Sequence, residues 1–141
     1  MKARNGMIKK VEFYFYHEKA IRLAVYEARL DHVPVGNSPG GIINRPVERQ
    51  ALRNIYPLKS VVLDGGYVAT NPEAWLKVID KTYELLDKST AGIARRRYKG
   101  DRYEDICKRY RIDKNKYYAM IEQVRQTAVL CAVQAGLIKV Y

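Results

Sequence analysis

The spacing of apolar side chains predicts a helix from Lys10 to Leu30, because these side chains recur at intervals of three or four residues. The side chains expected on its inward face are Phe13, Tyr16, Ala20, Leu23 or Val25, Tyr26 and Leu30. The charged residues expected mainly on its outward face are Lys9, Glu12, Lys19, Arg22 and Arg29. The aromatic run over residues 13–16 is also compatible with a short strand, which leaves the first residue of the helix open.

Residues 31–45 interrupt this periodic pattern with three glycines and two prolines, which predicts a flexible loop. Pro46 then suits the first turn of another helix, where the missing proline N–H would have no partner anyway. The apolar face of that helix is expected to hold Val47, Ala51, Leu52 and Ile55, before Pro57 ends or interrupts it. Residues 58–67 are compatible with either a helical extension or a short strand.

Two further helices are expected in the middle of the chain. Asn71, Pro72 and Glu73 form a helix-start signal, with an asparagine cap, a proline at the first position and an acidic first turn. This helix is predicted to run to about Asp87 with a buried stripe of Trp75, Ile79, Tyr83 and Leu86. Ser89 or Thr90 is then expected to cap a helix over residues 91–98, which Gly100 ends.

The last third of the chain predicts a helix-turn-helix. The first helix, over residues 102–110, has Tyr103, Ile106, Cys107 and Tyr110 on one face. Cys107 is small enough to let two helices cross closely, Ile112 fills the turn, and Asp113 caps the next helix. That second helix is expected from Lys114 to about Ala135, with Tyr117, Met120 or Ile121, Val124 and Ala128 facing inward.

The start of this second helix carries polar and cationic side chains on its outward side. They are Lys114, Asn115, Lys116, Tyr118, Ala119 and Glu122. In a DNA major groove, asparagine can read adenine, lysine can read guanine or hold a phosphate, and alanine or tyrosine can contact a thymine methyl group. We therefore predict that these six residues read bases of double-stranded DNA.

The charge of the chain supports a polyanionic partner. The formal net charge is +11, and residues 90–141 hold 12 basic and 5 acidic side chains, against 14 and 10 in residues 1–89. The residues expected to contact DNA phosphates are Arg95, Arg96, Arg97, Lys99, Arg102, Arg109 and Arg111. The alternative interpretation is that this basic run is only a solvated surface.

Other function classes find little support in the sequence. We find no glycine-rich phosphate loop and no Ser-His-Asp arrangement, and the two cysteines and two histidines show no metal-ligand spacing. We therefore expect no enzymatic activity, no catalytic residue, no metal and no cofactor. Because no apolar run approaches the roughly 20 residues of a membrane span, we expect a cytoplasmic protein without a membrane partner.

Strand signals are weak throughout, so the predicted fold is mainly α, with a small helical N-terminal part and a C-terminal helix-turn-helix with a long recognition helix. In chain order, the expected parts are an N-terminal helical segment (1–30), a flexible Gly/Pro loop (31–45), middle helices (46–89) and the DNA-binding helix-turn-helix domain (90–141).

The segment from Arg97 to Val124 resembles region four of bacterial sigma factors, a helix-turn-helix followed by a long helix. The wider layout resembles the RinA/ArpU family of phage-encoded transcriptional regulators: an aromatic N-terminal helix, a Gly-rich loop, the segment Arg45–Leu52 and a basic end. This resemblance implies an activator of late phage genes in a bacterial host cell, and the same six base-facing positions. For such a regulator we expect the N-terminal part to serve in self-association or in contact with RNA polymerase.

One residue departs from the family pattern. Arg111 stands in the turn where glycine is usual, which predicts strain of about 1 kcal/mol if its φ angle is positive. The alternative function is that of a small terminase subunit or another DNA-packaging protein of a phage, because such proteins also combine a helix-turn-helix with an oligomerising helix.

Overall fold

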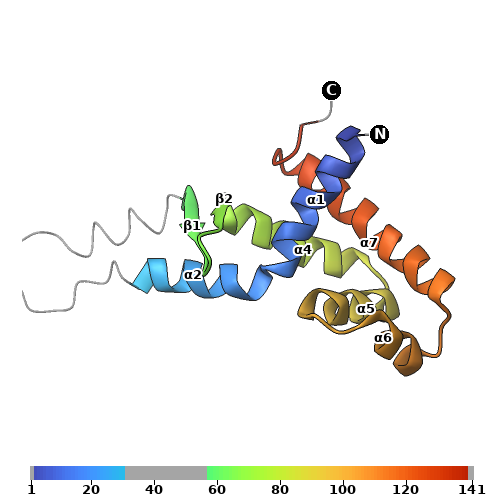
Figure 1. Cartoon of the computed structure of the whole chain (residues 1–141). Coiled ribbons are helices and arrows are strands. Elements are labelled where there is room, and N and C mark those ends of the chain that lie inside the picture. The colour runs from blue at the N-terminus through green and yellow to red at the C-terminus, as the bar shows by residue number, and fades with distance from the viewer. Residues whose placement is uncertain (1, 31–56, 140–141) are drawn as a thin grey trace, which may run out of the picture. The chain divides into compact units, whose positions relative to one another are not determined.

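A computed structural model describes residues 2–30 and 57–139, and within them the fold is mainly helical, as predicted (Figure 1). The helices are α1 (Lys2–Tyr16), α2 (Glu18–Leu30), α4 (Pro72–Leu85), α5 (Lys88–Lys99), α6 (Tyr103–Tyr110) and α7 (Lys114–Gln134). The strands are β1 (Ser60–Val62) and β2 (Val68–Thr70). The predicted loop over residues 31–45 and the helix expected from Pro46 lie outside the described residues.

The chain divides into two compact units, one of residues 1–18 and 74–141 and the other of residues 19–73. In the first unit, α7 packs against α1, α5 and α6. Buried side chains of α1 and α4 meet within the same unit, where the ring of Tyr14 stacks on that of Trp75 with centroids 4.2 Å apart. The first helix of the chain therefore shares a core with the last, whereas the division predicted from the sequence followed chain order.

The N-terminal helix differs from its prediction. Two helices replace the single one expected over residues 10–30, with α1 beginning at Lys2 and a break at His17. The buried side chains are Val11, Tyr14, Phe15 and Ile21. The side chains of Tyr16, Leu23, Tyr26 and Leu30, expected to face inward, are 46–62% exposed. The prediction of this face was wrong because four consecutive aromatic residues define no helical phase, and the break at His17 shifts the phase again.

The second unit contains a β-hairpin, so the strand alternative for residues 58–67 is the one observed. Strands β1 and β2 are antiparallel, and Val61 pairs with Ala69 on the buried face. Their connection holds two glycines with φ angles of 87° and 85°, which other residues rarely adopt.

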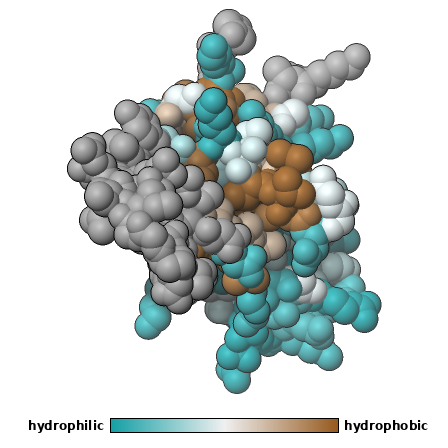
Figure 2. Space-filling view, turned by 90° about the vertical axis from the view of Figure 1, so that its left-hand side faces the viewer, coloured by the Kyte–Doolittle hydropathy of each residue, from teal (hydrophilic) through white to brown (hydrophobic). Residues whose placement is uncertain are grey.

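Exposed apolar side chains remain on the protein surface, and Figure 2 shows one area where they gather, bordered by hydrophilic groups.

The starts of α4 and α5 show one confirmed and one wrong prediction. Helix α4 begins at Pro72 as predicted but ends at Leu85 rather than at about Asp87, and the predicted stripe of Trp75, Ile79, Tyr83 and Leu86 is buried, with Leu86 just beyond the helix. Helix α5, however, begins at Lys88, because Asp87 rather than Ser89 or Thr90 is its cap. The Asp87 carboxylate accepts hydrogen bonds from the Thr90 hydroxyl at 2.7 Å and the Thr90 N–H at 3.2 Å, which lowers the pKa of Asp87.

Candidate nucleic-acid interface

Helices α6 and α7 form the predicted helix-turn-helix around a small apolar core. Its fully buried members are Ile93, Ile106, Tyr117 and Ile121, each at most 1% exposed. The partly buried side chains packed against them are Tyr103, Cys107, Tyr110, Ile112 and Met120. The sequence therefore identified the members of this core on α6, in the turn and on α7, but not Ile93 of α5. Of its two alternatives on α7, Ile121 is the buried one while Met120 packs at the margin.

The turn between α6 and α7 contains Arg111 in a left-handed conformation, with φ 54° and ψ 49°. The N–H of Ile112 donates to the carbonyl of Cys107 at 3.1 Å, and the N–H of Arg111 donates to that of Lys108 at 3.4 Å. These bonds satisfy carbonyls at the end of α6, as a glycine turn would. The condition for strain at Arg111 is met, at a cost of about 1 kcal/mol.

Helix α7 begins as the sequence predicted. The Asp113 carboxylate accepts a hydrogen bond from the Lys116 N–H at 2.7 Å and so caps the helix. The Cys107 thiol lies 3.8 Å from the Asp113 carbonyl, and burial together with the charges of Asp113 and Glu104 raises the pKa of this thiol. A protonated thiol is a weak nucleophile, which agrees with a packing role for Cys107.

Five of the six predicted base-reading residues are exposed on the first two turns of α7: Lys114, Asn115, Lys116, Tyr118 and Ala119. Tyr118 is 41% exposed, and its ring packs edge-on against the buried ring of Tyr117, with centroids 5.0 Å apart. The Lys114 ammonium group lies 6.0 Å from the centre of the Tyr118 ring. The sixth residue, Glu122, is half-buried and pairs with Arg125 at 3.6 Å, so its carboxylate already has a partner.

Four of the residues predicted to contact phosphates interact with other side chains of the same protein. Arg95 lies over the Tyr83 ring at 4.0 Å, Arg96 pairs with Asp101 at 3.3 Å and Arg102 pairs with Glu104 at 3.2 Å. Arg97 is half-buried and donates a hydrogen bond to the Tyr117 hydroxyl at 3.1 Å. Three consecutive arginines on a helix point in three directions, so the structure does not bring Arg95, Arg96 and Arg97 together on one surface.

The other predicted phosphate contacts, Lys99, Arg109 and Arg111, are exposed and form no ion pair within the described residues. The sequence interpretation missed Lys108, which is equally exposed on the last turn of α6. Its position next to Arg109, on the side opposite Ile106, was the available signal. Five exposed cations therefore flank the turn: Lys108, Arg109, Arg111, Lys114 and Lys116. We call this group the turn surface.

A largely buried cluster of charged side chains lies where α1, α5 and α7 meet. The Glu12 carboxylate accepts a hydrogen bond from the Tyr98 hydroxyl at 2.8 Å and lies 3.6 Å from Arg97 and 3.3 Å from Arg125. Glu12 was expected to face outward, which was wrong, because its side chain is only 15% exposed. These four residues, the Glu12 cluster, connect α1, α5 and α7.

Burial and charge shift the proton affinities in the Glu12 cluster. Burial raises the pKa of Tyr98, and the Glu12 carboxylate raises it further. Burial alone would lower the pKa of Arg97, but its hydrogen bond to Tyr117 and the charge of Glu12 raise it overall. The Nε atoms of Arg97 and Arg125 are buried, and neither has a hydrogen-bond acceptor among the described residues. Glu12 is therefore a compensating charge shared by two largely buried cations, of which Arg125 also pairs with Glu122.

Within residues 2–30 and 57–139, no helix has the length and apolar character to cross a membrane. The same residues contain no group of three or more His, Cys, Asp or Glu side chains placed to hold a metal ion. Comparison with known proteins gave no match to a family model, to a curated protein or to a solved structure.

Proposed function

We propose that this chain binds double-stranded DNA through α6 and α7 and acts as a sequence-specific transcriptional regulator. The observation that carries the proposal is the turn surface. It places five cations within nine residues, and the single acidic residue among them, Asp113, is engaged as the cap of α7. Such a concentration of unpaired positive charge at the start of a helix matches the phosphate backbone on either side of a major groove.

The packing of α7 supports a reading role for its first two turns. Tyr117 and Ile121 anchor α7 by packing in the core. The backbone that carries the exposed residues Lys114, Asn115 and Tyr118 is therefore held rigidly. Lys114 and Asn115 carry the donors and acceptors that distinguish guanine and adenine in the major groove. The resemblance of Arg97–Val124 to sigma region four favours a regulator, and that to the RinA/ArpU proteins favours an activator of late phage genes.

Selection of bound duplexes from a random pool tests the proposal, followed by fluorescence anisotropy on the selected site and on random DNA. Lys114→Ala combined with Asn115→Ala should weaken binding to the selected site roughly tenfold or more, and weaken binding to random DNA much less. Lys81→Ala is the matched control, because it removes the same charge from an exposed position on α4. Absence of any enriched sequence would refute specific regulation and favour the DNA-packaging alternative.

A further inference from the structure

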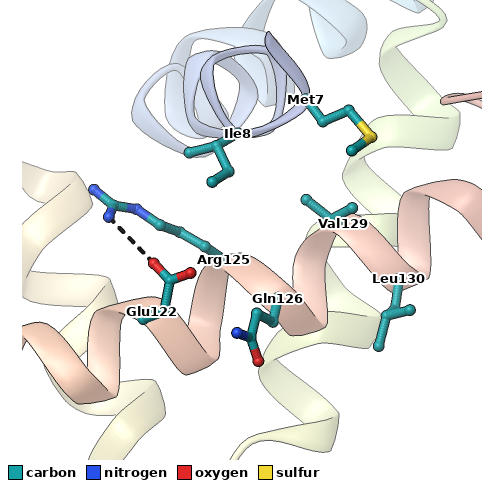
Figure 3. A pocket seen from close by; sticks show the side chains of 7 residues that line it. All are labelled: Met7, Ile8, Glu122, Arg125, Gln126, Val129 and Leu130. Atoms are coloured by element: carbon teal, nitrogen blue, oxygen red, sulfur yellow. Dashed lines mark ion pairs between the residues drawn. The ribbon is translucent and has the colours of Figure 1, made fainter. Parts of the chain in front are cut away.

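A hollow of about 370 Å³ lies between α1 and the C-terminal half of α7, both in the first compact unit (Figure 3). Its lining consists of Met7, Ile8, Glu122, Arg125, Gln126, Val129 and Leu130. Figure 3 shows Met7, Ile8 and Val129 pointing into the space between the two helices, and these three side chains are half-buried. Water therefore contacts an apolar surface inside this groove, which we call the α1–α7 hollow.

An exposed leucine stands at the margin of the α1–α7 hollow. Leu130 is 63% exposed, and Figure 3 shows it pointing away from α1, as Gln126 does. Burying a leucine side chain is favourable by an amount proportional to the apolar area removed from water. A leucine this exposed beside an apolar hollow is an arrangement that a second surface can bury.

The distribution of charge indicates which second surface can approach. The chain carries a net charge of +11, so two copies repel each other over much of their surface. Residues 126–138, however, contain no Asp, Glu, Lys, Arg or His. Among the residues whose side chains the structure describes, the ionisable ones that line the hollow are Glu122 and Arg125, and they pair with each other at 3.6 Å. A second copy can therefore contact this part of α7 without juxtaposing like charges.

We infer that the α1–α7 hollow is a homodimer interface in which Leu130 of each copy fills the hollow of the other. The protruding leucine and the hollow are neighbours on one surface, so a two-fold axis passing beside Leu130 exchanges them reciprocally. Such a contact is closed and stops at two copies. It also gives α1 a role in self-association.

This dimer contact leaves the turn surface uncovered. Leu130 follows Lys114 by sixteen residues, which is roughly 24 Å along the helix axis. If the proposed DNA-binding function holds, on which this consequence rests, the dimer presents two reading helices related by a two-fold axis. Its preferred DNA site is then an inverted repeat.

Sedimentation velocity of the full chain without DNA, from about 1 µM to about 100 µM, tests the contact. The unmodified chain should dimerise in this range. Leu130→Glu should raise the dimer dissociation constant at least about tenfold, because the symmetric contact then buries two added carboxylates. Leu85→Glu is the matched control, since Leu85 on α4 is 59% exposed, lies outside the hollow and receives the same charge change.

Far-UV circular dichroism first establishes that both variants keep their helical content, and Leu130→Ala replaces Leu130→Glu if the latter unfolds. A chain that stays monomeric throughout the range overturns the inference. So does equal weakening by Leu130→Glu and Leu85→Glu, or a larger assembly that Leu130→Glu leaves intact. These measurements involve no DNA. Dimerisation without DNA binding would refute the proposed function and leave the dimer interface standing.

Discussion

Replacing Glu12 by glutamine tests the Glu12 cluster, because this change removes a buried charge with little change in volume. The carboxylate lies 3.6 Å from Arg97 and 3.3 Å from Arg125. With an effective dielectric constant of about 20, each charge pair is worth about 5 kcal/mol before the cost of desolvation. That cost offsets much of the attraction in the intact protein, but in the variant Arg97 remains largely buried without its carboxylate partner and Arg125 keeps only its pair with Glu122.

We therefore expect Glu12→Gln to lower the free energy of unfolding by about 3 kcal/mol, the lower end for breaking a buried ion pair, because the arginine side chains are 18% and 24% exposed. Total stabilities of small proteins are about 5–15 kcal/mol, so this loss is easily measured. Urea unfolding followed by the fluorescence of Trp75, the single tryptophan, which is buried in the same unit, provides the assay.

Glu84→Gln is the control for Glu12→Gln. Glu84 is exposed on α4 and loses the same charge, so its replacement should change the free energy of unfolding by less than about 0.5 kcal/mol. If Glu12→Gln has an effect as small as that of Glu84→Gln, the carboxylate does not compensate Arg97 and Arg125, and the account of the cluster is wrong.

Three further predictions concern the helix-turn-helix. Arg109→Ala with Arg111→Ala should reduce the slope of log affinity against log salt by about 0.9 for each phosphate that the protein no longer neutralises. Arg96→Ala removes a cation that is paired with Asp101, so it should change this slope less. Equal changes of the slope in anisotropy titrations would contradict this difference between the arginines. Arg111→Gly should raise the free energy of unfolding by up to about 1 kcal/mol in urea titrations, because glycine adopts the positive φ angle without strain. The same change should weaken DNA binding, because it removes a cation. A lower free energy of unfolding would refute the strain at Arg111. Gly92→Ala should destabilise the protein despite the better helix propensity of alanine, because an added Cβ would lie 2.6 Å from the Tyr110 hydroxyl oxygen. In a Tyr110→Phe background, which lacks this oxygen, Gly92→Ala should lower the melting temperature less. If the loss in melting temperature is the same in both backgrounds, this collision is not its cause.

The sequence predicted the helix-turn-helix well because its signals are local. Tyr117, Ile121 and Val124 recur at helical intervals of four and three residues, and Asp113 marks the start of α7 by its own hydrogen bond. The α1 helix offered no comparable signal, because residues 13–16 are all aromatic and the break at His17 has no proline or glycine to announce it.

The Glu12 cluster could not be found from local patterns. A lone glutamate in a helix is ordinarily exposed, and Glu12 is buried because Tyr98, Arg97 and Arg125 meet it from distant parts of the chain. The same contacts explain why the three consecutive arginines were treated alike. Nothing local distinguishes Arg97 from Arg95 or Arg96, and only tertiary packing assigns it to the interior.

The Glu12 cluster also helps to hold α7, the candidate reading helix, in place. The first turns of α7 rest on α5 and α6 through Tyr117 and Ile121, whereas further along the helix Arg125 pairs with Glu12 of α1. Arg97 joins the two regions, because its guanidinium group contacts both the Tyr117 hydroxyl and Glu12. Without α1, Arg97 would lose its carboxylate partner and Arg125 would keep only Glu122, so the stability of α7 would fall. The unit that presents the turn surface therefore includes α1 as well as the C-terminal third of the chain.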